Sequence, residues 1–326
     1  MDYLFVLVGL GLLVVTGDLL VRGAVALSEK LGIPPLIIGL TVVAFGTSAP
    51  ELLISLKAAF DEVSGIAIGN VVGSNVANVL LVLGLPAIIT ATDANQPFIV
   101  RNTLFMLGSS VIFIALCFNG PLSVTHGVVL ITLLAVFLIE SARRAMRAKN
   151  GGPTVSEIET IDGVEGVPHS NGLIFVFLAA GIIGLPFGAH FTVEGASGIA
   201  REWGVSDAII GLTIVAIGTS LPELAATITA AVRKEAGLAI GNVIGSNMFN
   251  LLAIMGITSL LIPVPIPEEF LRVDLWIMLA SSALLVPYVL RRGQIGRVSG
   301  IVFVTLYVGY IVILLQPGLV GLAMAR

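Results

Sequence analysis

Two glutamates share the same short motif, and each lies within an apolar stretch. Glu51 ends the run GTSAPE at 46–51, and Glu223 ends the run GTSLPE at 218–223. Either one alone could be a structural carboxylate held by hydrogen bonds. A charged group near the centre of a bilayer costs roughly 2.5–3.5 kcal/mol, and here that cost recurs at two matching positions. The repetition favours a functional pair of acids.

The residues around each glutamate would supply further oxygen atoms. Pro50 and Pro222 have no N–H, so the carbonyl oxygens four residues earlier lose their helical donor. Residues three, four and seven positions before each glutamate share its helical face, and the next apolar segment carries a serine and an asparagine four residues apart. The candidate ion ligands are Ala44, Thr47, Ser48, Glu51, Ser74 and Asn78 in the first half, and Ala216, Thr219, Ser220, Glu223, Ser246 and Asn250 in the second.

All of these candidate ligands offer oxygen atoms, which favours hard cations. Calcium takes roughly six to eight oxygen ligands, and two carboxylates would neutralise its charge. Sodium would accept a subset of the same ligands. Zinc and copper prefer nitrogen and sulfur, and no cysteine or histidine lies in either motif. A proton is the alternative coupling ion, because a buried glutamate can also carry one.

Small and amide residues recur in the segment that follows each glutamate. Small residues let neighbouring helices approach closely, and we expect this role for Gly69, Gly73, Gly241 and Gly245. For the asparagines two roles stay open, bracing of backbone breaks or contact with ions. These asparagines are Asn70, Asn75, Asn242 and Asn247.

The composition places these motifs in a membrane protein. The chain has 326 residues, of which 57% are hydrophobic and 11% charged, with a mean hydropathy of +1.08, whereas soluble domains are about 25% charged. The single cysteine, Cys117, excludes an intrachain disulfide, and a net charge of −4 argues against nucleic-acid binding. Runs of roughly 20 apolar residues predict an all-α polytopic fold with ten spans, at 3–21, 36–58, 66–90, 98–117, 123–142, 172–192, 208–231, 238–262, 272–290 and 298–316.

The chain consists of two similar halves. Residues 39–78 and 211–250 align without a gap at an offset of 172 residues, with 23 identities in 40. Each half carries five predicted spans, an odd number, so the second copy must cross the membrane in the opposite sense. Inverted repeats with interrupted helices are typical of secondary transporters with a central substrate site. We predict a first repeat at 1–145, a cytoplasmic linker at 146–170 and a second repeat at 171–326.

The positive charges predict the orientation of the chain. With ten spans, twelve of the sixteen Lys and Arg residues fall on the side that holds the linker, and the positive-inside rule assigns that side to the cytoplasm. The acids of the linker lack the ligand spacing of an EF-hand. The N-terminus has no basic region of the kind that precedes a cleavable signal, so we expect the first span to be retained. We therefore expect an integral protein of the cell membrane (the cytoplasmic or inner membrane), with both termini on the non-cytoplasmic side.

The paired segments GTS(A/L)PEL and GNV(V/I)GSNxxN resemble the alpha repeats of the sodium/calcium exchanger family, within the wider cation/calcium exchanger superfamily. The resemblance implies an inverted five-plus-five fold with four central ion sites, at which one calcium ion competes with several sodium ions. It implies that Glu51 and Glu223 hold calcium together with the backbone carbonyls of Thr47 and Thr219. By the same resemblance, flanking sodium sites would use Ala44, Ser48 and Ser246 on one side and Ala216, Ser220 and Ser74 on the other, with Asn78 and Asn250 at the centre.

One residue departs from part of that family. Potassium-dependent members carry Asp at the position of Asn250, so this chain looks like the potassium-independent type, and the occupant of its middle site stays open between sodium and water. The linker lacks the large calcium-sensing insert of animal exchangers, as in a compact prokaryotic-type member.

The sequence thus predicts a secondary active antiporter that exchanges Ca²⁺ for Na⁺ and moves net charge, with Ca²⁺/H⁺ exchange as the alternative. An intramembrane hydrolase would need a catalytic constellation, and none is apparent. A passive channel would not need symmetric broken helices with two acids at one depth. We expect no cofactor and no enzymatic activity. The expected partners are Ca²⁺, Na⁺ and the bilayer, with no nucleic acid and no obligatory protein partner.

Overall fold

The computed structural model describes residues 1–149, 166–205 and 210–315. Most of the predicted linker therefore lies outside the described residues. The first repeat contains α1 (Asp2–Leu31), α2 (Pro35–Ile38), η1 (Gly39–Val43), α3 (Ala44–Thr47), α4 (Ala49–Phe60), α5 (Ser64–Ala77), η2 (Asn78–Val82), α6 (Gly84–Ile89), β1 (Thr92–Asp93), α7 (Ile99–Phe118) and α8 (Val124–Lys149). The second contains α9 (Asn171–Glu202), η4 (Gly211–Val215), α11 (Ala216–Thr219), α12 (Leu221–Val232), α13 (Ala236–Met248), η5 (Phe249–Ile254), α14 (Met255–Leu261), η6 (Phe270–Asp274), α15 (Leu275–Ala283), α16 (Val286–Leu290), β2 (Gln294–Ile295) and α17 (Arg297–Leu315). The segments labelled η are π-helical turns within longer helices.

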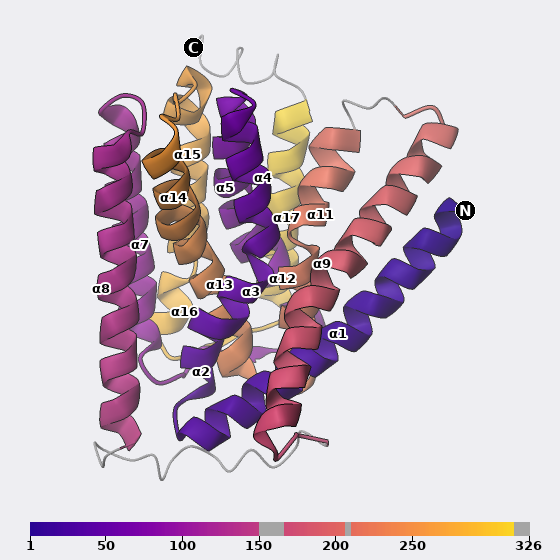
Figure 1. Ribbon diagram of the computed structural model, residues 1–326, viewed down its shortest axis with the longest axis vertical. Helices are drawn as coiled ribbons and strands as arrows, with labels where there is room; N and C mark the ends of the chain where they lie inside the picture. The colour runs from indigo at the N-terminus through magenta and orange to yellow at the C-terminus, as the bar shows by residue number, and fades with distance from the viewer. Residues whose placement is uncertain (150–165, 206–209, 316–326) are drawn as a thin grey trace.

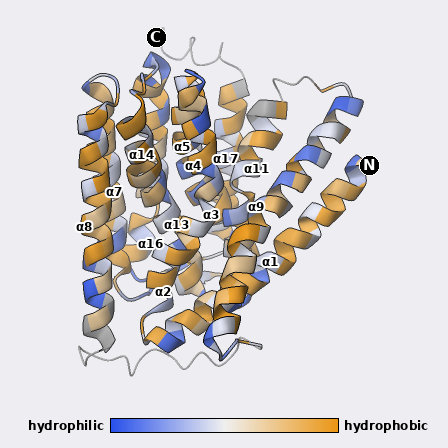
Figure 2. Ribbon diagram, viewed as in Figure 1, coloured by the Kyte–Doolittle hydropathy of each residue, from blue (hydrophilic) through white to orange (hydrophobic). Residues whose placement is uncertain are grey.

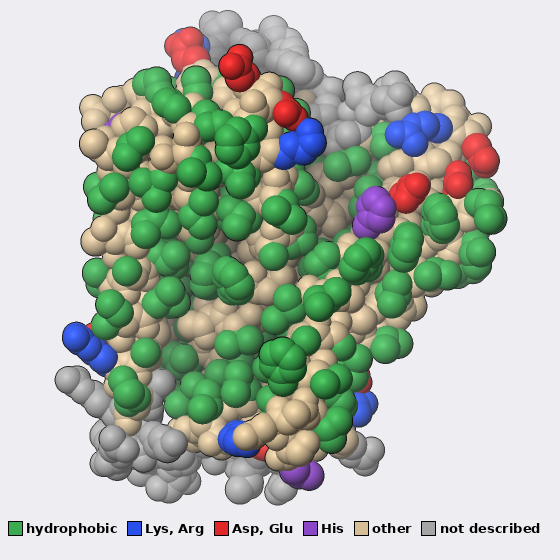
Figure 3. Space-filling model, in the orientation of Figure 1, with side chains coloured by type: hydrophobic (Ala, Val, Ile, Leu, Met, Phe, Trp, Pro, Cys, Tyr) green, Lys and Arg blue, Asp and Glu red, His purple; other side chains and the backbone are tan. Residues whose placement is uncertain are grey.

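The described helices confirm the all-α membrane fold. Eight are long and apolar enough to cross a bilayer, and two bent pairs raise the number of spans to ten. Apolar residues dominate these helices along their length (Figure 2). Hydrophobic side chains cover the flank of the molecule, while most charged ones gather near its two ends (Figure 3). A lipid-facing belt requires this distribution.

The first helix of each repeat is longer than predicted. The apolar runs end near residues 21 and 192, but α1 continues to Leu31 and α9 to Glu202. Charged residues end an apolar run in the sequence, but a helix can continue through them. Here the ion pair between Arg22 and Asp18, four residues apart, stabilises the helical turn. The helix α1 ends at Gly32, which takes a left-handed conformation and caps it.

These two long helices form one tightly packed antiparallel pair. Glycines allow backbone contact along the seam: a Cβ at Gly188 would lie 3.0 Å from the backbone N of Leu13, and one at Gly181 would collide with Leu20. In Figure 1, α1 and α9 lean together away from the other helices toward the end that carries the N-terminus. We call the opposite end, where α8 ends and α9 begins, the linker end.

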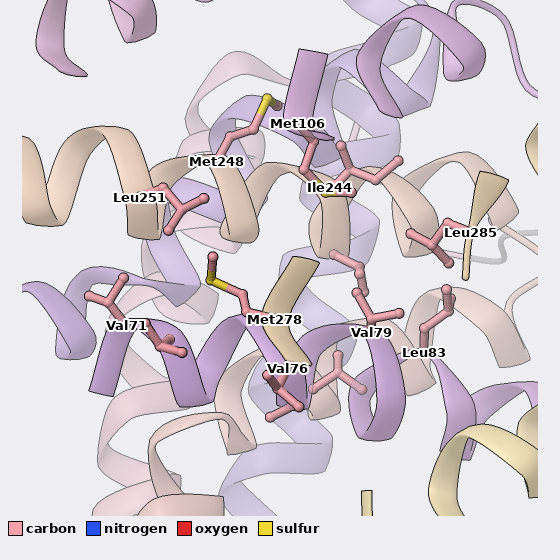
Figure 4. Packing of buried hydrophobic residues seen from close by; sticks show 14 of the residues in the cluster. Val71, Val76, Val79, Leu83, Met106, Ile244, Met248, Leu251, Met278 and Leu285 are labelled. Carbon is pink, nitrogen blue, oxygen red and sulfur yellow. The ribbon is translucent and has the colours of Figure 1, made fainter. Parts of the chain in front are cut away.

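The remaining helices pack as the inverted repeat requires. The helix α17 packs on α6 and α8 packs on α14, which are equivalent contacts with the two repeats exchanged. Two short antiparallel pairings follow the same rule, Thr92 with Ile295 and Leu122 with Val264. A buried apolar cluster from both repeats joins these helices at their centre (Figure 4).

Candidate cation site

The two motif helices break close to the proline of each motif. The chain bends by 45° between α3 and α4 and by 55° between α11 and α12. In each case a single serine, Ser48 or Ser220, separates the two helices, and the proline follows in the first turn of the second one. Proline is tolerated at that position because the first N–H groups of a helix have no partner within it. The break therefore lies at the serine, two residues before the proline.

Each break places its glutamate in the first turn of a helix. Glu51 and Glu223 are each 1% exposed, so neither points into lipid. The partial positive charge at a helix N-terminus favours a carboxylate there. Ser48 Oγ of the first repeat donates a hydrogen bond to Glu223 Oε1 of the second, at 3.1 Å. This bond crosses between the repeats and brings the two motifs to one place.

Several oxygen atoms of the predicted site are buried without a protein partner. The second carboxylate oxygen, Oε2, of both Glu51 and Glu223 accepts no hydrogen bond. Four other predicted site residues also have a buried oxygen without a hydrogen-bond partner. These oxygens are Asn78 Oδ1, Asn250 Oδ1, Ser220 Oγ and Ser246 Oγ. A buried oxygen without a partner costs roughly 1–3 kcal/mol. A bound cation would remove that cost.

The predicted threonine and alanine ligands of each repeat are joined by a hydrogen bond. Thr47 Oγ1 donates to the carbonyl of Ala44 at 3.4 Å, and Thr219 Oγ1 donates to the carbonyl of Ala216 at 3.1 Å. The remaining predicted ligand, Ser74, is 5% exposed. In the part of the chain that the structure describes, no three Cys, His, Asp or Glu side chains converge. Two carboxylates and a set of neutral oxygens are thus what the site offers.

The two halves of the site differ in exposure. Ala44 and Thr47 are buried, at 0% and 1%, whereas Ala216 is exposed and Thr219 half-buried. In the first repeat η1 and α3 pack against α13, where a Cβ on Gly245 would lie 2.7 Å from the carbonyl oxygen of Leu40. The site is therefore closed at Ala44 and Thr47 and more open at Ala216 and Thr219, while the other second-repeat ligands stay buried.

The same asymmetry divides the glycines. The expected close approach is confirmed at Gly241 and Gly245, where an added Cβ would meet the first-repeat backbone. It is wrong at Gly73, which has nothing within 4 Å of that position, and at Gly69, whose nearest neighbour is the Phe270 ring at 3.4 Å. The four glycines occupy equivalent sequence positions, but only those of α13 have the backbone of another helix close to the added Cβ.

Two asparagines brace the glutamate helices. Asn70 Nδ2 donates to the carbonyl of Glu51 at 3.1 Å and to Ser55 Oγ at 2.9 Å. Asn242 Nδ2 makes the equivalent bonds to the carbonyl of Glu223 and to Thr227 Oγ1. Of the two roles left open by the sequence, the structure shows bracing here. Ser55 and Thr227 were missed, although a hydroxyl four residues after each glutamate was a readable signal.

A family model supports what the geometry indicates. The model described as "Sodium/calcium exchanger protein" matches residues 1–141 and 173–316. The chain belongs to the sodium/calcium exchanger family. Both halves of the chain match, as a duplicated unit requires.

Relatives match the exchanger over nearly its whole length. The "Putative antiporter CaxA" of Alkalimonas amylolytica is 35% identical over 94% of this chain and 96% of its own. The "Sodium/calcium exchanger MaX1" of Methanosarcina acetivorans is 33% identical over 96% of this chain and 98% of its own. A structure of the sodium-calcium exchanger NCX_Mj soaked with Na⁺ and Sr²⁺ superposes with a TM-score of 0.80 at 34% identity, covering 95% of this chain and 97% of that one. The exchanger thus has the predicted fold of ten transmembrane helices in two inverted repeats and is a membrane transporter.

Proposed function

We propose that this exchanger is a secondary active antiporter that moves Ca²⁺ in exchange for Na⁺ through one central site. The observation that carries the proposal is the convergence of two buried carboxylates, each with an unpartnered oxygen, on neutral oxygens from both repeats. These oxygens fit the hard, oxygen-rich shell of calcium. No cofactor and no catalytic step are needed.

The charge of the site would couple the two fluxes. Glu51 and Glu223 carry two negative charges that one Ca²⁺ balances, and sodium ions can balance the same charges. An empty site would keep both charges unneutralised in a dehydrated place, which is costly. The empty transporter would therefore change state slowly, so that movement of one ion species requires the other. If more than two Na⁺ enter for each Ca²⁺, the membrane potential biases exchange by about 2.3 kcal/mol per net charge per 100 mV.

Protons are the rival coupling ion, because both glutamates could bind them. Uptake of ⁴⁵Ca²⁺ into proteoliposomes separates the two functions. An outward Na⁺ gradient is expected to drive uptake, whereas an outward proton gradient in sodium-free buffer is expected to leave it at background. Uptake driven only by protons would replace sodium in the proposal, and uptake with neither gradient would indicate a channel.

Removal of a serine hydroxyl from the site is expected to weaken sodium more than calcium. The Oγ of Ser220 has no protein partner, and that of Ser48 already donates to Glu223. Losing one neutral ligand costs roughly 0.5–1.5 kcal/mol, so Ser220→Ala should raise the sodium half-saturation about threefold to tenfold. Ser48→Ala should act in the same direction with a smaller sodium preference, because it also frees a carboxylate oxygen that calcium can use.

The measurement is ion dependence of exchange in proteoliposomes. Ser110→Ala is the matched control, since Ser110 is buried and donates to the carbonyl of Met106 in its own helix. Equal shifts for both ions in Ser220→Ala would contradict the assignment of that hydroxyl to sodium.

We infer that α1 and α9 move as one body to expose the site to each side in turn. The pair is tightly packed, and it is fastened to the rest of the molecule near the linker end. Asp18 of α1 pairs with Arg22 at 2.8 Å and accepts from Arg233 Nε, just after α12, at 2.6 Å. The equivalent residues in the other repeat, His190 and Asp61, have side chains 67% and 53% exposed. The ion pair would thus hold the linker end closed in this conformation.

Breaking this ion pair is expected to open the linker end. The side chains of Asp18 and Arg233 are 26% and 20% exposed, so the pair is worth about 1 kcal/mol. Asp18→Asn should raise the labelling rate of a cysteine at Thr229, which faces Gly17 of α1, about fivefold. The test uses a Cys117→Ala background and a charged maleimide.

Exchanging the two charges, in Asp18→Arg with Arg233→Asp, should restore slow labelling. Asp61→Asn, which removes the acid at the position equivalent to Arg233 in the other repeat, is the control and should leave the rate unchanged. Wild-type labelling in Asp18→Asn would show that the pair does not hold this end closed.

The linker end is proposed to face the cytoplasm of a cell membrane, with both termini on the other side. Arg22, Arg143 and Arg233 are among the basic residues near that end, in agreement with the positive-inside rule. To test this orientation, a cysteine is placed within residues 150–165 and its labelling by a membrane-impermeant reagent is measured in intact cells.

A further inference from the structure

Four asparagines from both repeats bond to one another at the centre of the molecule. Asn75 and Asn78 come from α5 and η2, and Asn247 and Asn250 come from α13 and η5; each is 1% exposed. Asn78 Nδ2 donates to Asn247 Oδ1 at 3.0 Å, and Asn250 Nδ2 donates to Asn75 Oδ1 at 3.1 Å. Both bonds cross from one repeat to the other.

These bonds decide which end of each amide is left without a protein partner. An asparagine amide has a donating NH₂ at one end and an accepting oxygen at the other. Because the NH₂ groups of Asn78 and Asn250 are held by the opposite repeat, their oxygens point away from that bond. Both oxygens are buried and accept no hydrogen bond from the protein. An inward oxygen attracts a cation, whereas an inward NH₂ would repel it.

The orientation of the Asn75 amide is itself fixed by a backbone carbonyl, which can only accept a hydrogen bond. Its Nδ2 donates to the backbone carbonyl of Asn247 at 3.4 Å and lies 3.6 Å from Met278 Sδ. A backbone carbonyl only accepts, so a flipped Asn75 would place two oxygens against each other. Asn247 points its own Nδ2 toward Met106 Sδ at 3.8 Å. Figure 4 shows Met106 and Met278 within the apolar cluster around this region.

We propose that Asn75 and Asn247 are positioning residues that hold the amide oxygens of Asn78 and Asn250 toward the cation site. Asn75 and Asn247 do not touch the ion themselves; they act on it through Asn78 and Asn250. The relay runs from the carbonyl of Asn247 through the amide of Asn75 to the amide of Asn250. This inference rests on the proposed function, because it assigns the bonds a role in cation binding. It also explains how a site with asparagine at both central positions can favour a cation.

The orientation of residue 250 matters only while that residue is an amide. A carboxylate has oxygens at both ends, so Asn250→Asp removes the consequence of a flip. Asn75→Leu should therefore weaken ⁴⁵Ca²⁺ binding to the purified full-length protein in sodium-free buffer by about tenfold or more. In the Asn250→Asp background the same substitution should cost less than about threefold. A purely structural role for Asn75 would cost the same in both backgrounds.

Two further variants keep the test decisive. Asn75→Ala repeats the comparison if the leucine variant does not fold, as judged by thermal unfolding. Asn75→Asp keeps the acceptor for Asn250 but loses the donor to the carbonyl of Asn247, so calcium binding should weaken less than in Asn75→Leu. Equal losses in the two backgrounds would overturn the positioning role while leaving the proposed function intact. Failure of the wild type to bind either Ca²⁺ or Na⁺ would overturn the proposed function and this inference with it.

Discussion

Glu51→Gln and Glu223→Gln are each expected to abolish calcium exchange while the chain still folds. Each substitution removes one of the two charges that would balance Ca²⁺ and leaves the other carboxylate in place. Loss of one partner from a buried charge pair typically costs about 3–5 kcal/mol, which corresponds to a loss of more than a hundredfold in affinity. Folding should survive because the amide keeps the shape of the side chain and each Oε2 has no protein partner to lose.

The measurement is sodium-driven ⁴⁵Ca²⁺ uptake, with thermal unfolding as the check on folding. Glu202→Gln is the matched control, since it removes the same charge from an exposed position at the end of α9. Substantial exchange in both site variants would refute the central role of the two carboxylates.

Gly245→Ala and Gly73→Ala are expected to change stability in opposite directions, although they alter equivalent positions of the two repeats. A Cβ on Gly245 would lie 2.6 Å from Ala44 Cβ and 2.7 Å from the carbonyl oxygen of Leu40. Overpacking of this kind costs about 1–3 kcal/mol. Gly73 has no atom within 4 Å of the added Cβ, so alanine there should stabilise α5 by about 0.5–1 kcal/mol through its better helix propensity.

Thermal unfolding of the purified variants measures both effects. Gly245→Ala should lower the midpoint by several degrees, whereas Gly73→Ala should leave it unchanged or raise it. Equal destabilisation by both variants would mean that α5 is packed as closely as α13, which would contradict the asymmetry between the two halves of the site.

Much of the site was predictable because its chemistry is local and occurs twice. The proline of each GTSxPE run breaks a helix in either repeat, so the position of Glu51 and Glu223 beside a break followed from the sequence. The convergence of the two glutamates followed from the inversion of the repeats. The Ser48 bond to Glu223 is the contact that joins them.

Other features could not be predicted because they depend on the opposite repeat or on capping. Hydropathy ended α1 near residue 21, whereas the helix ends at the Gly32 cap. Asn70 and Asn75, for which the same two roles stayed open, make different contacts that only the tertiary structure shows. Asn70 reaches a backbone carbonyl of its own repeat, while Asn75 accepts a bond from Asn250 of the other.

The sequence by itself determined the inverted five-plus-five arrangement and the all-oxygen character of the site. Both follow from residue types and spacing, which are nearly identical in the two halves. Only the tertiary structure decided that Thr47 is enclosed while Thr219 is partly open, and that Asp18 of α1 pairs with Arg233 after α12. Because the two motifs are nearly identical in sequence, nothing local predicts a difference in the exposure of their residues. The difference arises because α13 packs closely against η1 and α3, whereas a Cβ at Gly73 of α5 would meet nothing within 4 Å.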